Sequence, residues 1–420
     1  MIAGRTAADH QVLRERPPTG GPERVKAVRS CLSLAAMSFC IGTWVSRLRS
    51  RGPFGVSIAP ALAALVSAAW TGVDGSTHAA PPDAPPHLTL VGEGPDAAPP
   101  AGRPNPAGRP VRLTLHWEND GGWYKPNRDT DRHYTNGTGL SVSFQPGWLE
   151  RSLGGGGPQS TAAGLTVGQL LFTPDDITVE NPGPDDHPYA SYFYVGGFVQ
   201  REQAGALDHL QVDVGMIGPS TRGEQVQEWV HRVTGSPDPE GWDAQLGDEF
   251  TYQLTYRRRH RVELATFGAW GRDGAVQLIP SAELRLGNVY RSAGLGVVGR
   301  VGFNLPDDYG PSMLRDIGSF TSPDFATSGS GWWGYGFVGL SGRYNEWNTF
   351  IEGSNRRDPS PSVSLVPWTG ELQVGAVLGF RGGRHDFTGM YSQVFLTDTF
   401  REQTTRDAHA SWTLSWTYRF

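Results

Sequence analysis

From Val111 to the C-terminus, apolar and polar residues alternate with a period of two. The last twelve residues show the pattern best, because even positions from Ala410 to Phe420 are apolar and odd positions from His409 to Arg419 are polar. Such alternation predicts β-strands with one apolar and one polar face. We count roughly twelve such segments, separated by turns rich in Gly, Pro, Asp and Asn. Further clear examples are residues 111–117, 140–144, 210–216, 250–256 and 372–380.

Two architectures produce this pattern, a secreted β-sandwich and a transmembrane β-barrel. A basic start at Arg47, Arg49 and Arg51 followed by an apolar stretch over residues 56–70 is typical of an export signal. No apolar run long enough for a helical span follows Val111. The aromatic C-terminus is typical of Gram-negative outer-membrane proteins. We therefore predict an all-β fold, a transmembrane antiparallel barrel of about 12 strands in the bacterial outer membrane.

The composition divides the chain into three parts. Residues 1–79 are expected to be an N-terminal extension and signal peptide, residues 80–110 a Pro/Ala-rich disordered linker, and residues 111–420 the barrel with its catalytic site. Both cysteines, Cys31 and Cys40, precede the barrel. This position excludes a disulfide scaffold, a Cys-ligated metal and a Cys nucleophile from the barrel. The net charge of −6, without a long basic run, argues against nucleic acid as a partner.

One segment departs from the strand pattern. Residues 223–234 (GEQVQEWVHRVT) predict a helix that ends at Gly235. Glu224, Gln227 and His231 fall on one helical face, and we expect this helix in an extracellular loop, where function is often found. His231 is the candidate general base, with Gln227 and Glu224 in support. The sequence holds no G-x-S-x-G elbow, H-E-x-x-H zinc helix or phosphate-binding glycine loop.

Oxygen-bearing side chains gather near the first predicted strand. They comprise Glu118, Asn119, Asp120 and the polar block at residues 131–137 (DRHYTNG). Such donors suit a hard cation such as Ca²⁺. Asn136-Gly137 is also a strong hairpin-turn signal, and composition alone favours a turn there.

Several short motifs, in series, resemble the outer-membrane lipid A 3′-O-deacylase family. In chain order they are Trp117-Glu118-Asn119-Asp120, the block at 131–137, Phe172-Thr173-Pro174, Asp186-His187-Pro188-Tyr189-Ala190, Gly215-Met216-Ile217-Gly218-Pro219, Val226-Gln227 to His231, and Gly241-Trp242-Asp243-x-Gln245. Each motif alone is weak, and the fact that all of them occur in the family's order over one continuous stretch makes the resemblance specific.

The resemblance implies a twelve-stranded barrel whose active site lies between the wall and an outer-loop helix. It implies a Ca²⁺-dependent carboxylic ester hydrolase that removes the 3′-linked acyloxyacyl chain of lipid A. By motif, Asn119 and Asp120 would act at the metal and the scissile carbonyl, Thr135 beside them, and His231 as general base. Glu118 would support the Asn-Asp pair. The expected partners are lipopolysaccharide, the membrane and the barrel-assembly machinery, which would read Phe420; we expect a monomer.

Two departures from the family pattern concern the substrate. The family places a Lys shortly after the Tyr-Thr-Pro-like turn, whereas residues 175–185 contain no Lys or Arg. His187 stands where the family has Arg. Two other functions stay open at this point: a non-catalytic barrel serving as a pore or structural protein, and an outer-membrane phospholipase.

Overall fold

The computed structural model describes residues 88–90, 109–120, 131–153, 161–269, 272–312, 330–357 and 359–420. The predicted extension and signal peptide at residues 1–79 lie outside the described residues. Most of the predicted linker at residues 80–110 also lies outside them. Within the linker, Leu88–Leu90 form the short strand β1, which pairs with β8.

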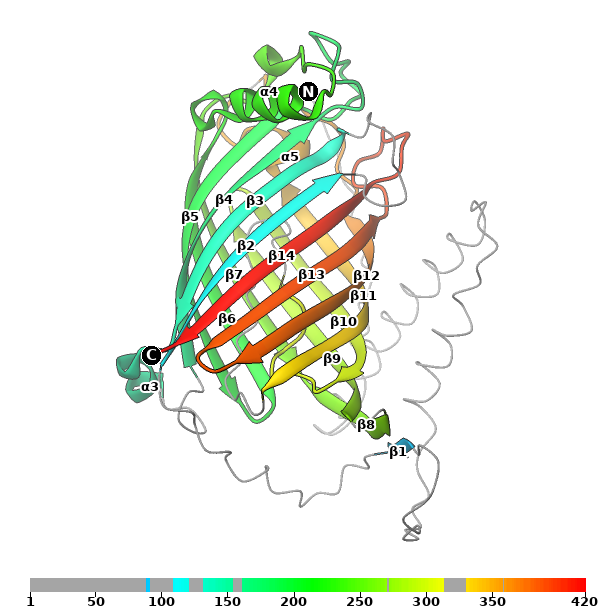
Figure 1. Ribbon diagram of the computed structural model, residues 1–420. Helices are drawn as coiled ribbons and strands as arrows, with labels where there is room; N and C mark the ends of the chain where they lie inside the picture. The colour runs from blue at the N-terminus through cyan, green and yellow to red at the C-terminus, as the bar shows by residue number, and fades with distance from the viewer. Residues whose placement is uncertain are drawn as a thin grey trace, which may run out of the picture. The chain divides into compact units, whose positions relative to one another are not determined.

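The described chain forms a β-barrel (Figure 1). Its wall strands are β2 (Pro110–Asp120), β3 (His133–Phe144), β4 (Thr161–Thr173), β5 (Ala190–Gln203), β6 (Ala206–Ile217), β7 (Glu249–His260), β8 (Val262–Ala269), β9 (Arg272–Gly287), β10 (Tyr290–Phe303), β11 (Gly331–Asn348), β12 (Trp368–Gly382), β13 (His385–Leu396) and β14 (Ala408–Arg419). The helices are α3 (Gly147–Leu153), α4 (Gly223–Thr234) and α5 (Thr349–Glu352), with 3₁₀ turns at Pro219–Thr221 and Trp242–Ala244.

Every wall pairing is antiparallel, and the sheet closes because the last strand pairs with the first of the wall. Trp412 of β14 stands opposite Trp117 of β2, and the two indoles stack with centroids 4.7 Å apart. β7 and β8 both pair with β9 and are separated by Arg261, so together they occupy one position in the wall. The result is the twelve-stranded antiparallel barrel that the alternation predicted.

The two faces of the wall have opposite polarity. On β2, Leu113, Leu115 and Trp117 are exposed on the outside. The intervening Thr114 and His116 are fully buried on the inside. An apolar exterior around a polar interior is the inverse of a soluble β-sandwich and is typical of an outer-membrane barrel. Among the described residues, no helix combines the length and apolar character needed to cross a membrane.

The connections that hold α4 and α5 lie at one end of the barrel. We call it the outer end, because the extracellular loops of such barrels are the longer ones and the β6–β7 connection is the longest between the wall strands. α4 and α5 lie there, opposite the C-terminus (Figure 1). α4 spans Gly223–Thr234 and ends at Gly235, whose φ of 73° is the left-handed conformation that favours glycine. The predicted helix is therefore confirmed, with its stop signal.

The turn expected at Asn136-Gly137 is wrong. Both residues lie inside β3, where Asn136 stands opposite Asn119 of β2 and Leu171 of β4. Strand pairing on both sides overrides the local turn preference, because each residue gains ladder hydrogen bonds that a turn would lose. β2 instead runs to Asp120, and β3 begins at His133.

Side chains fill the barrel interior at both ends of the described wall. At the outer end, Phe350 of α5 stacks on Phe172 with ring centroids 4.0 Å apart, inside a buried apolar cluster that includes Tyr192. Toward the other end, the buried Arg300 pairs with Asp308, in the segment after β10. Fixed packing of this kind across the interior differs from the water-filled channel of a porin.

Candidate functional site

Helix α4 rests on the outward face of β4 and β5 at the outer end of the wall. The closest approach is at Gly223, where a Cβ would lie 2.3 Å from Ser191 Cβ and 3.0 Å from Leu171 Cδ2. Only glycine leaves room for this contact. The helix is further supported by a buried apolar cluster of Leu171, Ile177, Tyr189 and Trp242, against which Val226 packs.

The buried face of α4 carries His231 and Gln227. His231 Nδ1 donates a hydrogen bond to the carbonyl oxygen of Pro237. Because a carbonyl only accepts, this bond fixes the proton on Nδ1. The other ring nitrogen, Nε2, lies 2.5 Å from Asp131 Oδ2.

Two opposing effects act on the pKa of His231. Burial lowers it, whereas the hydrogen bonds to Asp131 and to the Pro237 carbonyl raise it, and the net shift is upward. A neighbouring anion favours the imidazolium, which is the physical cause of that rise.

A second contact from the helix fixes the same carboxylate. Gln227 Nε2 donates to Asp131 Oδ2 at 3.1 Å, and Gln227 Oε1 accepts from the indole of Trp242 at 2.8 Å. The amide is thus held at both ends. As a result, Asp131 receives contacts from two residues one helical turn apart.

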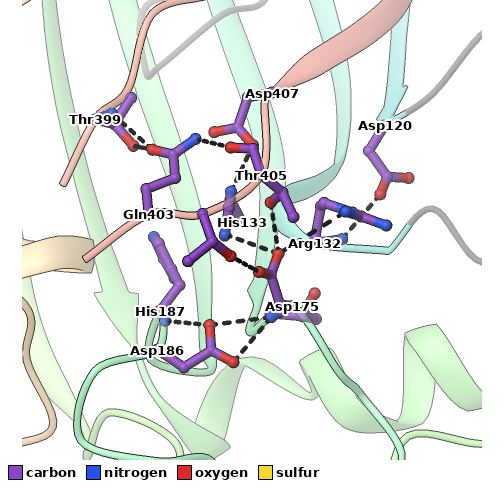
Figure 2. A network of polar contacts seen from close by, with 12 residues as sticks. Asp120, Arg132, His133, Asp175, Asp186, His187, Thr399, Gln403, Thr405 and Asp407 are labelled. Atoms are coloured by element: carbon purple, nitrogen blue, oxygen red, sulfur yellow. Dashed lines mark hydrogen bonds and ion pairs between the residues drawn. The ribbon is translucent and has the colours of Figure 1, made fainter. Parts of the chain in front are cut away.

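Asp131 is also connected, through the next residue, to the predicted metal-binding residues. The next backbone amide, that of Arg132, donates to Asp120 Oδ2 at 2.9 Å (Figure 2). Asp120 in turn accepts at Oδ1 from Asn119 Nδ2 at 3.2 Å. His231, Asp131 and the Asn119-Asp120 pair therefore form one connected rim of polar groups. The amide and carboxylate oxygens of Asn119 and Asp120 are donors of the kind that a hard divalent cation such as Ca²⁺ takes.

Thr135 lies at the register shift in β3, between Tyr134 and Asn136. Its buried hydroxyl hydrogen-bonds Thr173 Oγ1 at 2.7 Å. Asn136 Nδ2 is 3.3 Å from Asn119 Oδ1, so the β3 bulge adjoins the Asn119 side chain.

Two of the predicted supporting residues lie apart from this rim. Glu118 is fully buried inside the barrel, where its carboxylate accepts from Tyr134 Oη at 2.7 Å and from Ser411 Oγ at 3.0 Å. Because successive side chains on a strand point to opposite faces, Glu118 points away from Asn119 and shares the inner face with Asp120. Glu224 shares a hydrogen bond with Gln225 one position on, at 3.1 Å.

Sequence reasoning gave no role to Asp131 or Trp242, although both stand in the family motifs. Asp131 precedes the strand and Trp242 follows the helix, so neither shares a periodic face with His231. The only available signal was their position within the DRHYTNG and GWDxQ blocks.

Comparisons with known proteins bear on the family and on the fold. A profile of the family described as "Outer membrane protein LpxR" matches residues 93–418. Among solved structures, LpxR from Salmonella typhimurium aligns with a TM-score of 0.57 at 20% identity, covering 74% of this chain and 100% of that one. The β domain of the Bordetella autotransporter BrkA aligns with a TM-score of 0.35 at 12% identity, covering 74% of this chain and 99% of that one. No curated protein sequence matches. The profile spans most of the chain and the described wall is that of a closed barrel, so this outer-membrane protein belongs to the LpxR family.

Proposed function

We propose that this protein is an outer-membrane lipid A deacylase, a Ca²⁺-dependent carboxylic ester hydrolase that removes the 3′-linked acyloxyacyl chain. Membership of the LpxR family supports the deacylase role. One observation carries the catalytic part of the proposal. The buried His231 ring is held by the Pro237 carbonyl at Nδ1 and by Asp131 at Nε2. The backbone amide next to Asp131, that of Arg132, donates to Asp120.

His231 acts as the general base. Nδ1 keeps its proton on the Pro237 carbonyl, so Nε2 is the nitrogen that can act as a base. It takes a proton from the attacking water once Asp131 Oδ2, which lies 2.5 Å from it, gives up this contact. The hydroxide adds to the ester carbonyl carbon, and the bond between that carbon and the 3′-oxygen of the sugar then breaks. The leaving 3′-oxygen takes the proton back from Nε2. Asp131 stabilises the imidazolium that exists between these two transfers.

Asn119 and Asp120 would hold the Ca²⁺, which when bound supplies positive charge for the developing oxyanion. Their own hydrogen bond and the one from the Arg132 amide orient both side chains before any ligand arrives. By the family resemblance, Thr135 would act beside them. Its hydroxyl is held by Thr173, which limits its motion.

The location of the site suits a membrane lipid. α4 lies against the outside of the wall, and its Trp229 and Val233, one turn apart, are 61% and 69% exposed. Exposed apolar side chains on a helix above an apolar wall favour a position at the membrane–water interface. An acyl chain could then remain in lipid while its ester reaches His231.

The pore alternative has less support, because packed aromatic residues and the Arg300–Asp308 pair cross the described interior. The phospholipase alternative shares the chemistry and differs in the headgroup. The absence of Lys and Arg from residues 175–185 is the feature that keeps it open. We also propose, from the family resemblance and the sequence pattern, that the protein is a monomer assembled through recognition of Phe420.

Mass spectrometry of lipid A and of glycerophospholipids from expressing cells tests the function. We expect a mass loss equal to the acyloxyacyl chain from lipid A, abolished by chelation of Ca²⁺ and by His231→Ala. His385→Ala is the matched control, because His385 is an exposed histidine on β13 that contacts Trp416 and no residue of the rim. If lipid A stayed unchanged and lysophospholipids appeared, the protein would be a phospholipase and our proposal would be wrong. Neither product from a heat-modifiable, folded barrel would exclude both.

A further inference from the structure

A second group of titratable side chains lies at the outer end and plays no part in the proposed hydrolysis. It is centred on His133, the first residue of β3, which is 2% exposed and has a φ of 54°. The left-handed backbone aims its ring at two loops that are distant in the sequence, residues 174–189 and residues 397–407. Figure 2 shows the ring between Asp175 and Asp407.

One ring nitrogen of His133 is firmly oriented. Nδ1 lies 2.5 Å from Asp407 Oδ1. A carboxylate only accepts when ionised, so Nδ1 carries the proton and the lone pair of the neutral ring resides on Nε2. A carboxylate that holds one nitrogen of a histidine while the other binds a metal is the usual second-sphere arrangement of metal sites.

The other nitrogen faces two carboxylates. Nε2 is buried without hydrogen-bond geometry to any group, and its nearest acceptor is Asp175 Oδ1 at 3.2 Å. Ligand atoms of His133, Asp175 and Asp186 all lie within 4.8 Å of one another. Two donors each about 2.1 Å from one ion stand roughly 3.0–3.4 Å apart, so the Nε2–Oδ1 separation matches a pair of ligands on a shared ion.

Both carboxylates are positioned by their surroundings. Asp175 Oδ1 accepts from Thr405 Oγ1 at 2.7 Å. Asp186 accepts from the backbone amides of Asp175 at 3.1 Å and His187 at 2.7 Å. These bonds leave lone pairs on each carboxylate available. Three acids surround one imidazole here, and Arg132 Nη1 lies 4.0 Å from Asp175 Oδ1. The three carboxylates therefore outnumber the two basic groups even when His133 is protonated.

We propose that His133, Asp175 and Asp186 bind a first-row divalent cation of the Zn²⁺ class, with Asp407 as the positioning residue of the histidine. An imidazole combined with carboxylates suits Zn²⁺, whereas Ca²⁺ takes oxygen ligands alone. The ion would fasten the start of β3 to both outer loops. The site shares no residue with Asn119, Asp120 or His231, and the inference does not depend on the proposed function.

The test is Zn²⁺ titration of the untagged full chain in detergent, followed by calorimetry and by thermal unfolding, after removal of metals by chelation. We expect one equivalent to bind and to raise the unfolding temperature. His133→Asn and Asp175→Asn should weaken Zn²⁺ binding by about 100-fold or more, and Asp407→Asn by about 10–100-fold. Asn is chosen at position 133 because it tolerates the left-handed backbone.

His231→Gln serves as the control, since it removes a buried histidine of the other group and should leave the Zn²⁺ affinity unchanged. Heat-modifiable migration in gels reports whether each variant is folded. Folded wild-type protein without Zn²⁺ binding at 100-fold excess would overturn the proposal in favour of a protonated His133 paired with two carboxylates. Equal Zn²⁺ affinity in His133→Asn and wild type would overturn it as well. Neither result bears on lipid A hydrolysis, which is assayed separately.

Discussion

Substitution of Gly223 by Ala should have two opposite effects on stability, because alanine favours the helix whereas its Cβ collides with the wall. In an isolated helix, Gly→Ala is worth up to about 1 kcal/mol of stabilisation. In this protein the added Cβ would lie 2.3 Å from Ser191 Cβ and 2.5 Å from Ser191 Oγ. Ordinary carbon–carbon contacts are about 3.5–4.0 Å, so the helix must move away from the wall by more than about 1 Å at its start.

We expect overpacking to outweigh propensity. Inserting a methyl into a packed contact costs about 1–3 kcal/mol, so the net change is a loss of up to about 2 kcal/mol. The catalytic consequence follows from His231 being carried by the same helix. A misplacement of about 1 Å at a catalytic group can cost about 100-fold in rate. The assays are the initial rate of lipid A deacylation and thermal unfolding of the purified barrel.

Two variants separate this packing effect from glycine replacement in general. Gly183→Ala is the matched control, because nothing lies within 4 Å of the added Cβ. Ser191→Gly, combined with Gly223→Ala, removes the two closest contacts and leaves Leu171 Cδ2 at 3.0 Å, so activity should largely return. A Gly223→Ala variant as active and stable as Gly183→Ala, or one that Ser191→Gly does not rescue, would refute the reasoning.

Three further outcomes are expected. Because Asp131 raises the pKa of His231 and the base must be neutral, the rate of deacylation should rise as the pH rises through that pKa. Asp131→Asn should move this acid limb of the pH–rate profile to lower pH. An acid limb that stays in place in the variant would contradict the assignment of His231 as the base. Trp242→Phe removes one hydrogen bond to the helix amide, so we expect a stability loss of about 1 kcal/mol with a larger fall in activity, measured by denaturant unfolding and deacylation. Asp308→Ala should destabilise the barrel by about 3 kcal/mol by leaving the buried Arg300 without its carboxylate, while deacylation per folded molecule stays unchanged; a fall in specific activity would show coupling to the outer end.

Only the parts of the candidate site that depend on neighbouring residues in the sequence could be predicted. The helix at Gly223–Thr234 and its glycine stop are encoded by neighbouring residues, so His231 and Gln227 could be assigned to one face in advance. The same face argument included Glu224, whose carboxylate instead accepts a hydrogen bond from Gln225. Helical spacing tells which side of the helix a residue is on. It does not tell whether the neighbouring part of the protein reaches along the helix as far as that residue.

By itself, the sequence determined the strand periodicity, the approximate number of strands, the helix at residues 223–234 and the family, because each depends on residues a few positions apart or on short motifs in order. The tertiary structure decided that Asp131 meets His231, that Glu118 turns inward, and that Asn136-Gly137 continue a strand. Each of these outcomes depends on the register of paired strands and on loops meeting across the barrel rim, where the hydrogen bonds and burial gained over long sequence separations outweigh local preference.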